Sequence, residues 1–257
     1  MSTNPADMKS QLIEYLKELG LPTMRGSFEE LAHRAQQESH SYERYLLELA
    51  ERECQARRGR RVERLLRESR LPLAKTLEAM DLKRLPPKVV QQVRGLLDGT
   101  FLDRCENVLV FGNPGSGKTH VLSAIAQELI RSGRRVYFRD CGLIVQDLLA
   151  AKREYALKGL LKRLEHWEGV VLDDLGYVQQ SREEMEVLFT FLAERYERGS
   201  VLVTSNLPFS KWDQIFKDPM TAAAAIDRLV HHSVIVELNV ASYRAEAAKK
   251  AKGLSAE

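Results

Sequence analysis

One stretch near the middle of the chain, residues 112–119 with the sequence GNPGSGKT, restricts the fold more than any other feature. It fits the pattern G-x-x-x-x-G-K-[ST] at every fixed position. The apolar run 108–111 before it predicts a strand, and residues 119–131 after it repeat apolar side chains at helical spacing until Gly133. A glycine-rich loop that joins a strand to a helix is typical of α/β domains built on a parallel sheet.

Short apolar runs, several of them rich in β-branched residues, predict the strands of this sheet. They cover residues 107–111, 135–139, 169–173, 200–205 and 233–238. Helical segments separate the runs, so we expect the strands to lie parallel with helices on both faces.

The pattern of apolar residues, prolines and glycines divides the chain into three parts. Residues 1–69 repeat apolar side chains at helical spacing and predict a small all-helical N-terminal domain. Residues 70–106 contain several prolines and glycines and predict a linker with one helix near 88–97. Residues 107–257 contain the predicted strands and should form the α/β domain.

Two helix boundaries in the N-terminal domain can be predicted from local signals. The first helix should cover residues 8–19 and end before Pro22. Ser27 and Glu30 fit a capping box, which predicts that a second helix begins there and runs to Gln37.

The composition is that of an ordinary globular protein, with 44% hydrophobic and 29% charged residues and a net charge of +3. No apolar run approaches the roughly 18–20 residues of a membrane span, and the N-terminus lacks a secretory signal. Cys54, Cys105 and Cys141 match neither a disulfide framework nor a zinc spacing, so we expect reduced thiols in a cytoplasmic protein without a membrane partner. His231 and His232 are adjacent and cannot share a helix face as a metal pair, so we interpret them as structural.

The chemistry of the glycine-rich loop predicts an ATP site. Its glycines let backbone N–H groups face the phosphates, and the following helix adds a partial positive charge beneath them. Lys118 offers a charge to the β- and γ-phosphates, and the Thr119 hydroxyl can join the shell of a Mg²⁺ ion. The predicted ATP-binding residues are Gly112, Asn113, Pro114, Gly115, Ser116, Gly117, Lys118 and Thr119.

Polar residues end two of the other predicted strands. Asp173 and Asp174 follow a buried run, at the carboxyl edge where open α/β sheets bind ligands. One carboxylate should hold Mg²⁺ through water and the other can orient the attacking water, although strand-end acids can also merely cap the next turn. Asn206, at the end of the run 201–206, could lie near the γ-phosphate.

Two stretches carry an excess of positive charge. The first, residues 51–70, has a surplus of +4, and the second, residues 150–165, has a surplus of +3. Lys158 and Lys162 in the second stretch are one helical turn apart and share a face. The basic residues of this second stretch are Lys152, Arg153, Lys158, Lys162 and Arg163. Such surfaces can contact phosphate backbones, and the alternative is that they are solvated helix faces.

Together these segments resemble a known family. The set GNPGSGKT, VVLDD, VTSN and VASYR is similar to the AAA+ ATPases of the DnaA/DnaC clade, and within it to the IstB-type transposition helper proteins of insertion sequences. The phrases at 75–78, 173–177 and 227–229 strengthen the resemblance, which covers residues 70–245. Only 19 residues follow Leu238, so the resemblance implies an AAA+ domain with a truncated lid.

The resemblance implies a role for individual residues. Asp173 is similar to the magnesium-coordinating acid of the family and Asp174 to its catalytic acid. Asn206 resembles the first sensor, and Arg244 resembles the second. Arg228 resembles an arginine finger that reaches the nucleotide of a neighbouring subunit, which implies a homo-oligomer; the alternative for both arginines is a surface salt bridge.

The function implied by the resemblance is ATP-dependent assembly on duplex DNA, in aid of a transposase that selects and captures its target. The basic residues of 150–165 occupy the region that faces DNA in this clade, and phosphate contacts there would read no sequence. A helicase loader of the DnaC type is the alternative with the same core. A small-molecule P-loop kinase is a different class, but the chain has no recognisable acceptor-binding motif.

Overall fold

The computed structural model describes residues 5–176, 181–212, 215, 219–243 and 246. The chain forms two compact units, Met1–Arg64 and Leu65–Glu257. The division falls inside a long helix, α3 (Tyr42–Ser69), whose last residue is the predicted end of the helical region. None of the described helices is both long and apolar enough to cross a membrane.

The first unit consists of α1 (Pro5–Glu18), α2 (Pro22–Gln37) and the larger part of α3. Its second helix begins five residues earlier than Ser27, so the predicted capping box is wrong. Pro22 starts α2 because a proline in the first turn has no N–H to leave unpaired. The side chain of Glu53, only 3% exposed, accepts the N–H groups of Thr23 and Met24 at 2.8 and 3.0 Å.

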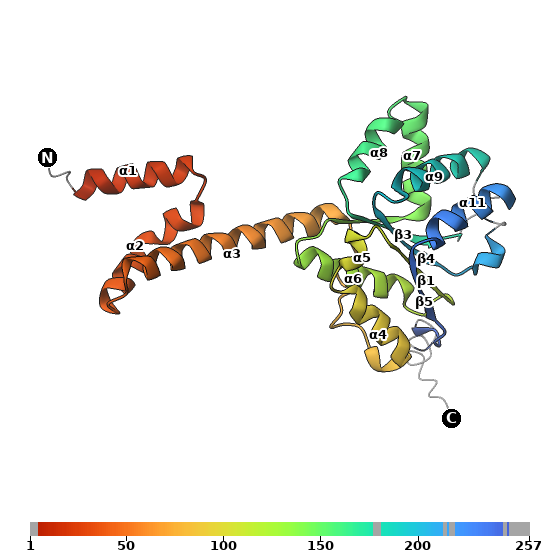
Figure 1. Ribbon diagram of the computed structural model, residues 1–257, viewed down its shortest axis with the longest axis horizontal. Coiled ribbons are helices and arrows are strands. Elements are labelled where there is room, and N and C mark those ends of the chain that lie inside the picture. Colours follow the sequence, from red (N-terminus) through yellow and green to blue (C-terminus); the bar gives the residue numbers. More distant parts are fainter. Residues whose placement is uncertain (1–4, 177–180, 213–214, 216–218, 244–245, 247–257) are drawn as a thin grey trace. The chain divides into compact units, whose positions relative to one another are not determined.

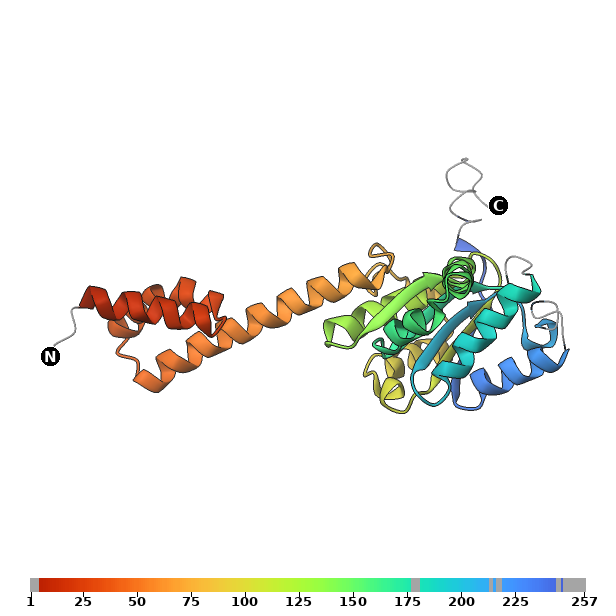
Figure 2. The ribbon, with the colours of Figure 1, turned by 90° about the horizontal axis from the view of Figure 1, so that it is seen from above.

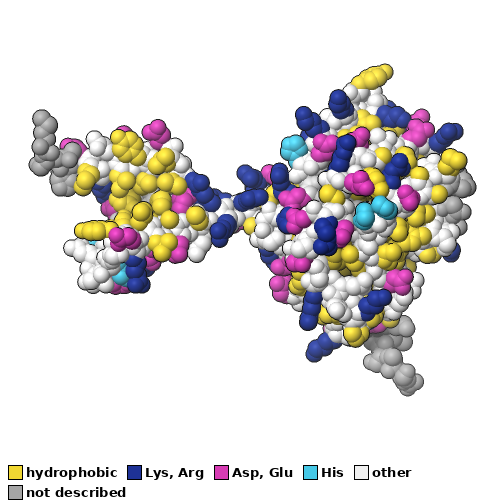
Figure 3. Space-filling model, in the orientation of Figure 1, with side chains coloured by type: hydrophobic (Ala, Val, Ile, Leu, Met, Phe, Trp, Pro, Cys, Tyr) yellow, Lys and Arg dark blue, Asp and Glu magenta, His cyan; other side chains and the backbone are white. Residues whose placement is uncertain are grey.

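Some of the arginines of α3 form ion pairs within the first unit. Arg57 and Arg60 both pair with the buried carboxylate of Glu53, at 3.1 and 3.2 Å. Large hydrophobic side chains gather on one side of this unit, where Figure 3 shows them close together. The exposed ones are Met8, Leu12, Tyr15, Leu19, Tyr42, Leu46 and Leu47.

The second unit is built on a five-stranded sheet in the order β2-β3-β4-β1-β5, with every neighbouring pair parallel. Each predicted run forms a strand, which confirms the predicted parallel α/β fold (Figure 2). The strands are β1 (Asn107–Gly112), β2 (Val136–Asp140), β3 (Gly169–Leu175), β4 (Ser200–Ser205) and β5 (Ser233–Leu238).

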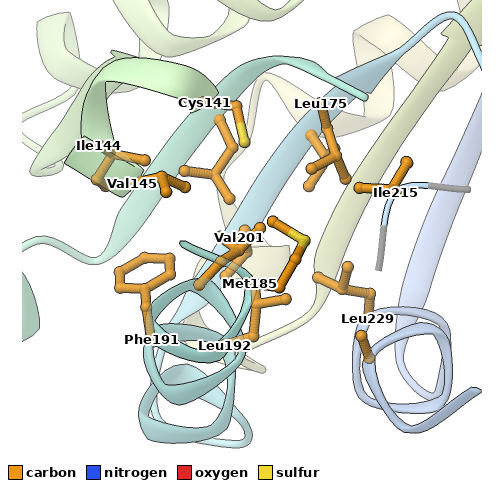
Figure 4. Close-up of a cluster of buried hydrophobic side chains, with 14 of the residues drawn as sticks. Cys141, Ile144, Val145, Leu175, Met185, Phe191, Leu192, Val201, Ile215 and Leu229 are labelled. Carbon is orange, nitrogen blue, oxygen red and sulfur yellow. The ribbon is translucent and has the colours of Figure 1, made fainter. Parts of the chain in front are cut away.

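Helices cover both faces of this sheet (Figure 1). On one face lie α4 (Pro87–Leu96) and α6 (Lys118–Arg131). The other face is covered by α7 (Cys141–Arg153), α9 (Arg182–Arg195) and α11 (Pro219–Val230). Side chains of these last three helices and of β3 and β4 form a buried hydrophobic cluster (Figure 4).

A helical hairpin joins the second and third strands. The first arm is α7, and the second is α8 (Leu157–Glu165). Tyr155, at the turn between them, has a left-handed backbone with φ of 56°. The turn leaves α8 as a short helix with its own basic face.

The segment 70–106, predicted as a linker with one helix near 88–97, lies within the second unit. It contains η1 (Leu82–Arg84), α4 and α5 (Thr100–Asp103), because Pro86 and Pro87 start α4 and do not interrupt a helix. Its buried side chains include Leu71, Leu85, Val89, Val93, Leu96, Phe101 and Leu102. Two side chains of α6 hold its beginning, since Gln127 donates to the Lys75 carbonyl at 3.0 Å and His120 hydrogen-bonds the Thr76 carbonyl at 2.8 Å.

Candidate nucleotide-binding site

The glycine-rich loop lies between β1 and α6 and is closely packed by the C-terminal part of the chain. A Cβ atom on Gly115 would lie 2.1 Å from the hydroxyl of Ser242, and one on Gly112 would lie 2.6 Å from the carbonyl of Leu238. Gly115 also has a φ of 80°, which few other residues adopt. A side chain at either position would meet Ser242 or Leu238, so the loop can take this path only with glycine there.

Lys118 and Ser116 supply polar groups inside the loop. The ammonium group of Lys118 donates to the carbonyls of Gly112 and Asn113, at 2.8 and 3.1 Å, and the side chain is 6% exposed. Among the residues that the structure describes, the buried Ser116 hydroxyl has no hydrogen-bond partner. Since α6 begins at Lys118, the positive end of its helix dipole faces the same loop. A positive charge, an unsatisfied hydroxyl and a helix N-terminus together fit a phosphate chain.

Asp173 lies at the carboxyl end of β3 and is 8% exposed. The Thr204 hydroxyl donates to its carboxylate at 2.6 Å, and the Thr119 hydroxyl also hydrogen-bonds it. Burial raises the pKa of Asp173 above its ordinary value, and the neighbouring charge of Asp174 adds to this, while the two threonines oppose it. The carboxylate and the Thr119 hydroxyl are hard oxygen donors, so this pair fits a Mg²⁺ ion.

Asp174 is turned away from its neighbour by an irregularity in the strand. Pairing between β3 and β4 shifts register between Leu172 and Leu175, and Asp174 has a left-handed φ of 59°. Its N–H donates to the Thr204 hydroxyl at 2.8 Å, so one threonine supports both acids. The exposed carboxylate of Asp174 lines the nucleotide cavity described next.

A cavity of about 500 Å³ lies in front of the loop and brings most of the predicted residues together. Asn206, at the end of β4, lines it together with Asp174 and the loop. Most of its remaining wall comes from the segment 70–106, which was predicted as a linker, and was therefore missed by sequence reasoning. These additional lining residues are Lys75, Ala79, Met80, Asp81, Arg84, Leu85 and Tyr243.

The C-terminal part of the chain contributes Tyr243 to this wall. Its N–H donates to the Gly115 carbonyl at 3.0 Å, and the guanidinium of Arg84 lies 3.9 Å from the centre of its ring. Arg84 also pairs with Glu246 at 2.6 Å. Arg244, the predicted second sensor, lies outside the described residues.

Arg228 lies on α11, near the amino-terminal ends of the strands. The glycine-rich loop lies at their carboxyl-terminal ends. The amide of Asn107, the first residue of β1, donates to its carbonyl at 3.3 Å. The guanidinium lies 4.4 Å from the centre of the Phe189 ring, and one of its nitrogens is buried without a hydrogen-bond partner. Within the described residues Arg228 has no ion pair, so the salt-bridge alternative has no partner there.

The basic residues of the α7–α8 hairpin fall into two groups. Lys152 and Arg153, on α7, pair with Glu186 and Glu183 of α9 at 3.1 and 3.4 Å. The group on α8 is exposed and has no ion pair among the described residues. That group consists of Lys158, Lys162 and Arg163.

The parallel sheet, the glycine-rich loop on a helix N-terminus and the strand-end acids define a P-loop nucleotide-binding domain of the AAA+ type. The chain belongs to the family of IstB-like ATP binding proteins, whose family model matches residues 14–251.

Relatives in this family are proteins of insertion sequences. The chain is 41% identical to an insertion sequence ATP-binding protein of Sinorhizobium fredii, over 92% of this chain and 80% of that protein. It is 36% identical to the insertion sequence IS21 ATP-binding protein of Pseudomonas aeruginosa, over 87% of this chain and 84% of that one.

Solved structures agree on the fold. The DnaC helicase loader superposes with a TM-score of 0.52 at 18% identity, over 59% of this chain and 89% of that one. AMPPCP-bound DnaA from Aquifex aeolicus gives 0.56 at 18% identity, over 72% and 56%. At such identities the likeness concerns the AAA+ fold alone.

Proposed function

We propose that this protein is a Mg²⁺-dependent ATPase that assembles on duplex DNA and helps a transposase to select and capture its target during insertion-sequence transposition. The observation that carries the proposal is the nucleotide cavity, in which Lys118, Asp174 and Asn206 meet a family-defining loop. The names of the relatives, which are insertion sequence proteins, support the transposition context. We place the activity in the cytoplasm, where bacterial DNA and ATP are found together.

In the proposed hydrolysis, Asp173 and Asp174 have different roles. Asp173 and the Thr119 hydroxyl would hold Mg²⁺, whose charge offsets that of the phosphates. Asp174 is exposed to the cavity and free of that task, so its carboxylate can orient a water molecule and accept its proton. Lys118 would neutralise charge on the β- and γ-phosphates, and Asn206, which lines the same cavity, would contact the γ-phosphate.

DNA binding is the second part of the proposal, and α8 supports it. Its exposed cations lack ion pairs within the described chain, so they are available to phosphates. Lys158 and Lys162 lie one turn apart and would contact the backbone without reading bases. Assembly of several subunits would multiply a few weak contacts into stable binding.

The proposal is tested by measuring phosphate release from ATP with no DNA, with duplex DNA and with single strands. We expect stimulation by duplexes of unrelated sequence, and co-purification with the transposase encoded by the same element. Stimulation by single strands alone, with capture of a replicative helicase, would instead support the loader function. Turnover that ignores DNA altogether would contradict the DNA-binding part of the proposal.

A further inference from the structure

Three side chains of types that bind metal ions lie close together near the amino-terminal ends of the strands, away from the nucleotide cavity. Glu197 lies in the turn after α9, and His231 and His232 lie in the turn between α11 and β5. One ligand atom from each lies within 4.8 Å of the others, and all three side chains are exposed. We propose that these residues form a Zn²⁺-binding site.

The sequence argument against a metal pair assumed that both histidines lie on a helix. The structure corrects this assumption, because α11 ends at Val230 and the two residues form a turn. In the turn their rings meet edge to face, with centroids 4.1 Å apart. Adjacent histidines can therefore present nitrogen atoms to one point, which a helix would prevent.

The Tyr196 hydroxyl orients two of the three ligands. It lies 3.1 Å from Nδ1 of His231 and also hydrogen-bonds the Glu197 carboxylate. If His231 donates its Nδ1–H to the hydroxyl and the hydroxyl donates to Glu197, then Nε2 of His231 carries a free lone pair. This carboxylate–hydroxyl–imidazole chain is the kind of support that fixes the tautomer of a metal-binding histidine.

Two buried polar residues hold the two turns in place. Asn107 donates to the Leu229 carbonyl at 3.0 Å and accepts the N–H of Val201 at 2.8 Å, so it links the end of α11 to β4. Arg195 donates to the Ser200 carbonyl at 2.9 Å, across the turn that carries Glu197. The ligand-bearing backbone is therefore fixed while the ligand side chains stay accessible.

The ligand set favours zinc among common metals. Two imidazoles and one carboxylate are borderline donors that suit Zn²⁺, whereas Mg²⁺ and Ca²⁺ prefer oxygen atoms alone. Three protein ligands leave a fourth tetrahedral position for water or for a residue of another molecule. His232 and Glu197 also line a cavity of about 370 Å³ that contains Arg228, so a bound ion would join two turns beside that residue.

The test is isothermal titration of the tag-free full chain with Zn²⁺ in the absence of nucleotide. We expect one ion per chain, and a rise in thermal midpoint on binding. His232→Ala and Glu197→Gln should each weaken binding by about 100-fold, and Tyr196→Phe, which removes only the orienting hydroxyl, by about tenfold. His166→Ala, at an exposed histidine beyond α8, is the matched control and should bind like the parent.

Loss of affinity in the three variants but not in the control supports the site. Parental affinity in both His232→Ala and Glu197→Gln overturns it, as does the absence of any stoichiometric binding to the parent. Glu197 and His232 are exposed and Tyr196 is half-buried, so parental circular dichroism and parental ATP affinity serve as the check on folding.

Discussion

At the scale of single residues, the two neighbouring acids of β3 show how one strand end can supply two different functions. Asp173 is buried and bound by two threonine hydroxyls, whereas Asp174 is exposed and twisted into a left-handed conformation. A left-handed aspartate costs conformational energy, and such strain tends to persist where a side chain must be aimed. The sequence predicted both acids, but not the register shift that separates them.

The first prediction concerns Asp174→Asn. The variant should keep ATP and Mg²⁺ binding and lose most of its turnover, because an amide cannot accept a proton from water. Lys118→Ala should instead weaken ATP binding itself, since it removes a charge from the phosphate site. Phosphate release and nucleotide titration measure the two effects, and parental turnover in Asp174→Asn would refute its assignment as the catalytic acid.

The second prediction concerns Lys75. It was not predicted to line the nucleotide site because it lies in the segment that was interpreted as a linker. Its side chain lines the nucleotide cavity, and its charge acts on the carboxylate of Asp173. Lys75→Met should weaken ATP binding by about tenfold, which corresponds to one charge-assisted hydrogen bond. Lys83→Met, on η1 and outside the cavity lining, is the control; equal affinities of the two variants would show that Lys75 does not contact the nucleotide.

At the scale of elements, the strands and the starts of α4 and α6 could be predicted closely, whereas the start of α2 could not. A parallel strand buried on both faces is a continuous apolar run, so 200–205 coincides with β4. The edge strand β5 is only partly buried, but its bounds also coincide with the predicted run 233–238. The start of α2 combines Pro22, which the sequence analysis used only as the end of the preceding helix, with Glu53, which is 30 residues from Thr23 in sequence. The nucleotide cavity was predicted only in part for the same reason, since one wall comes from a distant segment.

The third prediction belongs to α8. Lys158→Ala combined with Lys162→Ala should weaken duplex binding similarly for unrelated sequences, because both cations are exposed and face phosphates in the proposal. Two lost phosphate contacts should flatten the slope of log affinity against log salt by about 1.8. Lys83→Ala with Lys88→Ala removes the same charge from another exposed surface and should leave the slope unchanged.

An unchanged slope in the α8 double variant would place the DNA surface elsewhere. The arginine-rich part of α3 is then the next candidate, although Arg57 and Arg60 already pair with Glu53. The paired Lys152 and Arg153 should matter less than the α8 cations, because their ion pairs with α9 must be exchanged for phosphate contacts.

At the scale of the whole molecule, the nucleotide cavity and Arg228 lie at opposite ends of the strands of one sheet. The cavity follows the last residue of β1, whereas Arg228 is held by the first residue of the same strand. Arg228 therefore cannot reach the nucleotide of its own chain. We propose that its half-buried guanidinium, which lies on the Phe189 ring, meets an anion brought by another subunit.

The last prediction joins hydrolysis to this proposed assembly. Arg228→Ala should leave the subunit folded and able to bind ATP, but should hydrolyse it poorly, because a neighbour's arginine can contribute about 10³–10⁵ to the rate. Lys118→Ala has the reverse defect, with an intact arginine and a damaged nucleotide site. A titration of one variant into the other should restore part of the ATPase activity that neither shows alone, provided that subunits exchange. If Arg228 served only in a surface contact, its loss would cost about 0–1 kcal/mol of stability and leave turnover near the parental rate. Parental turnover of the single variant, measured at a protein concentration where the parent is assembled, would therefore remove Arg228 from the reaction.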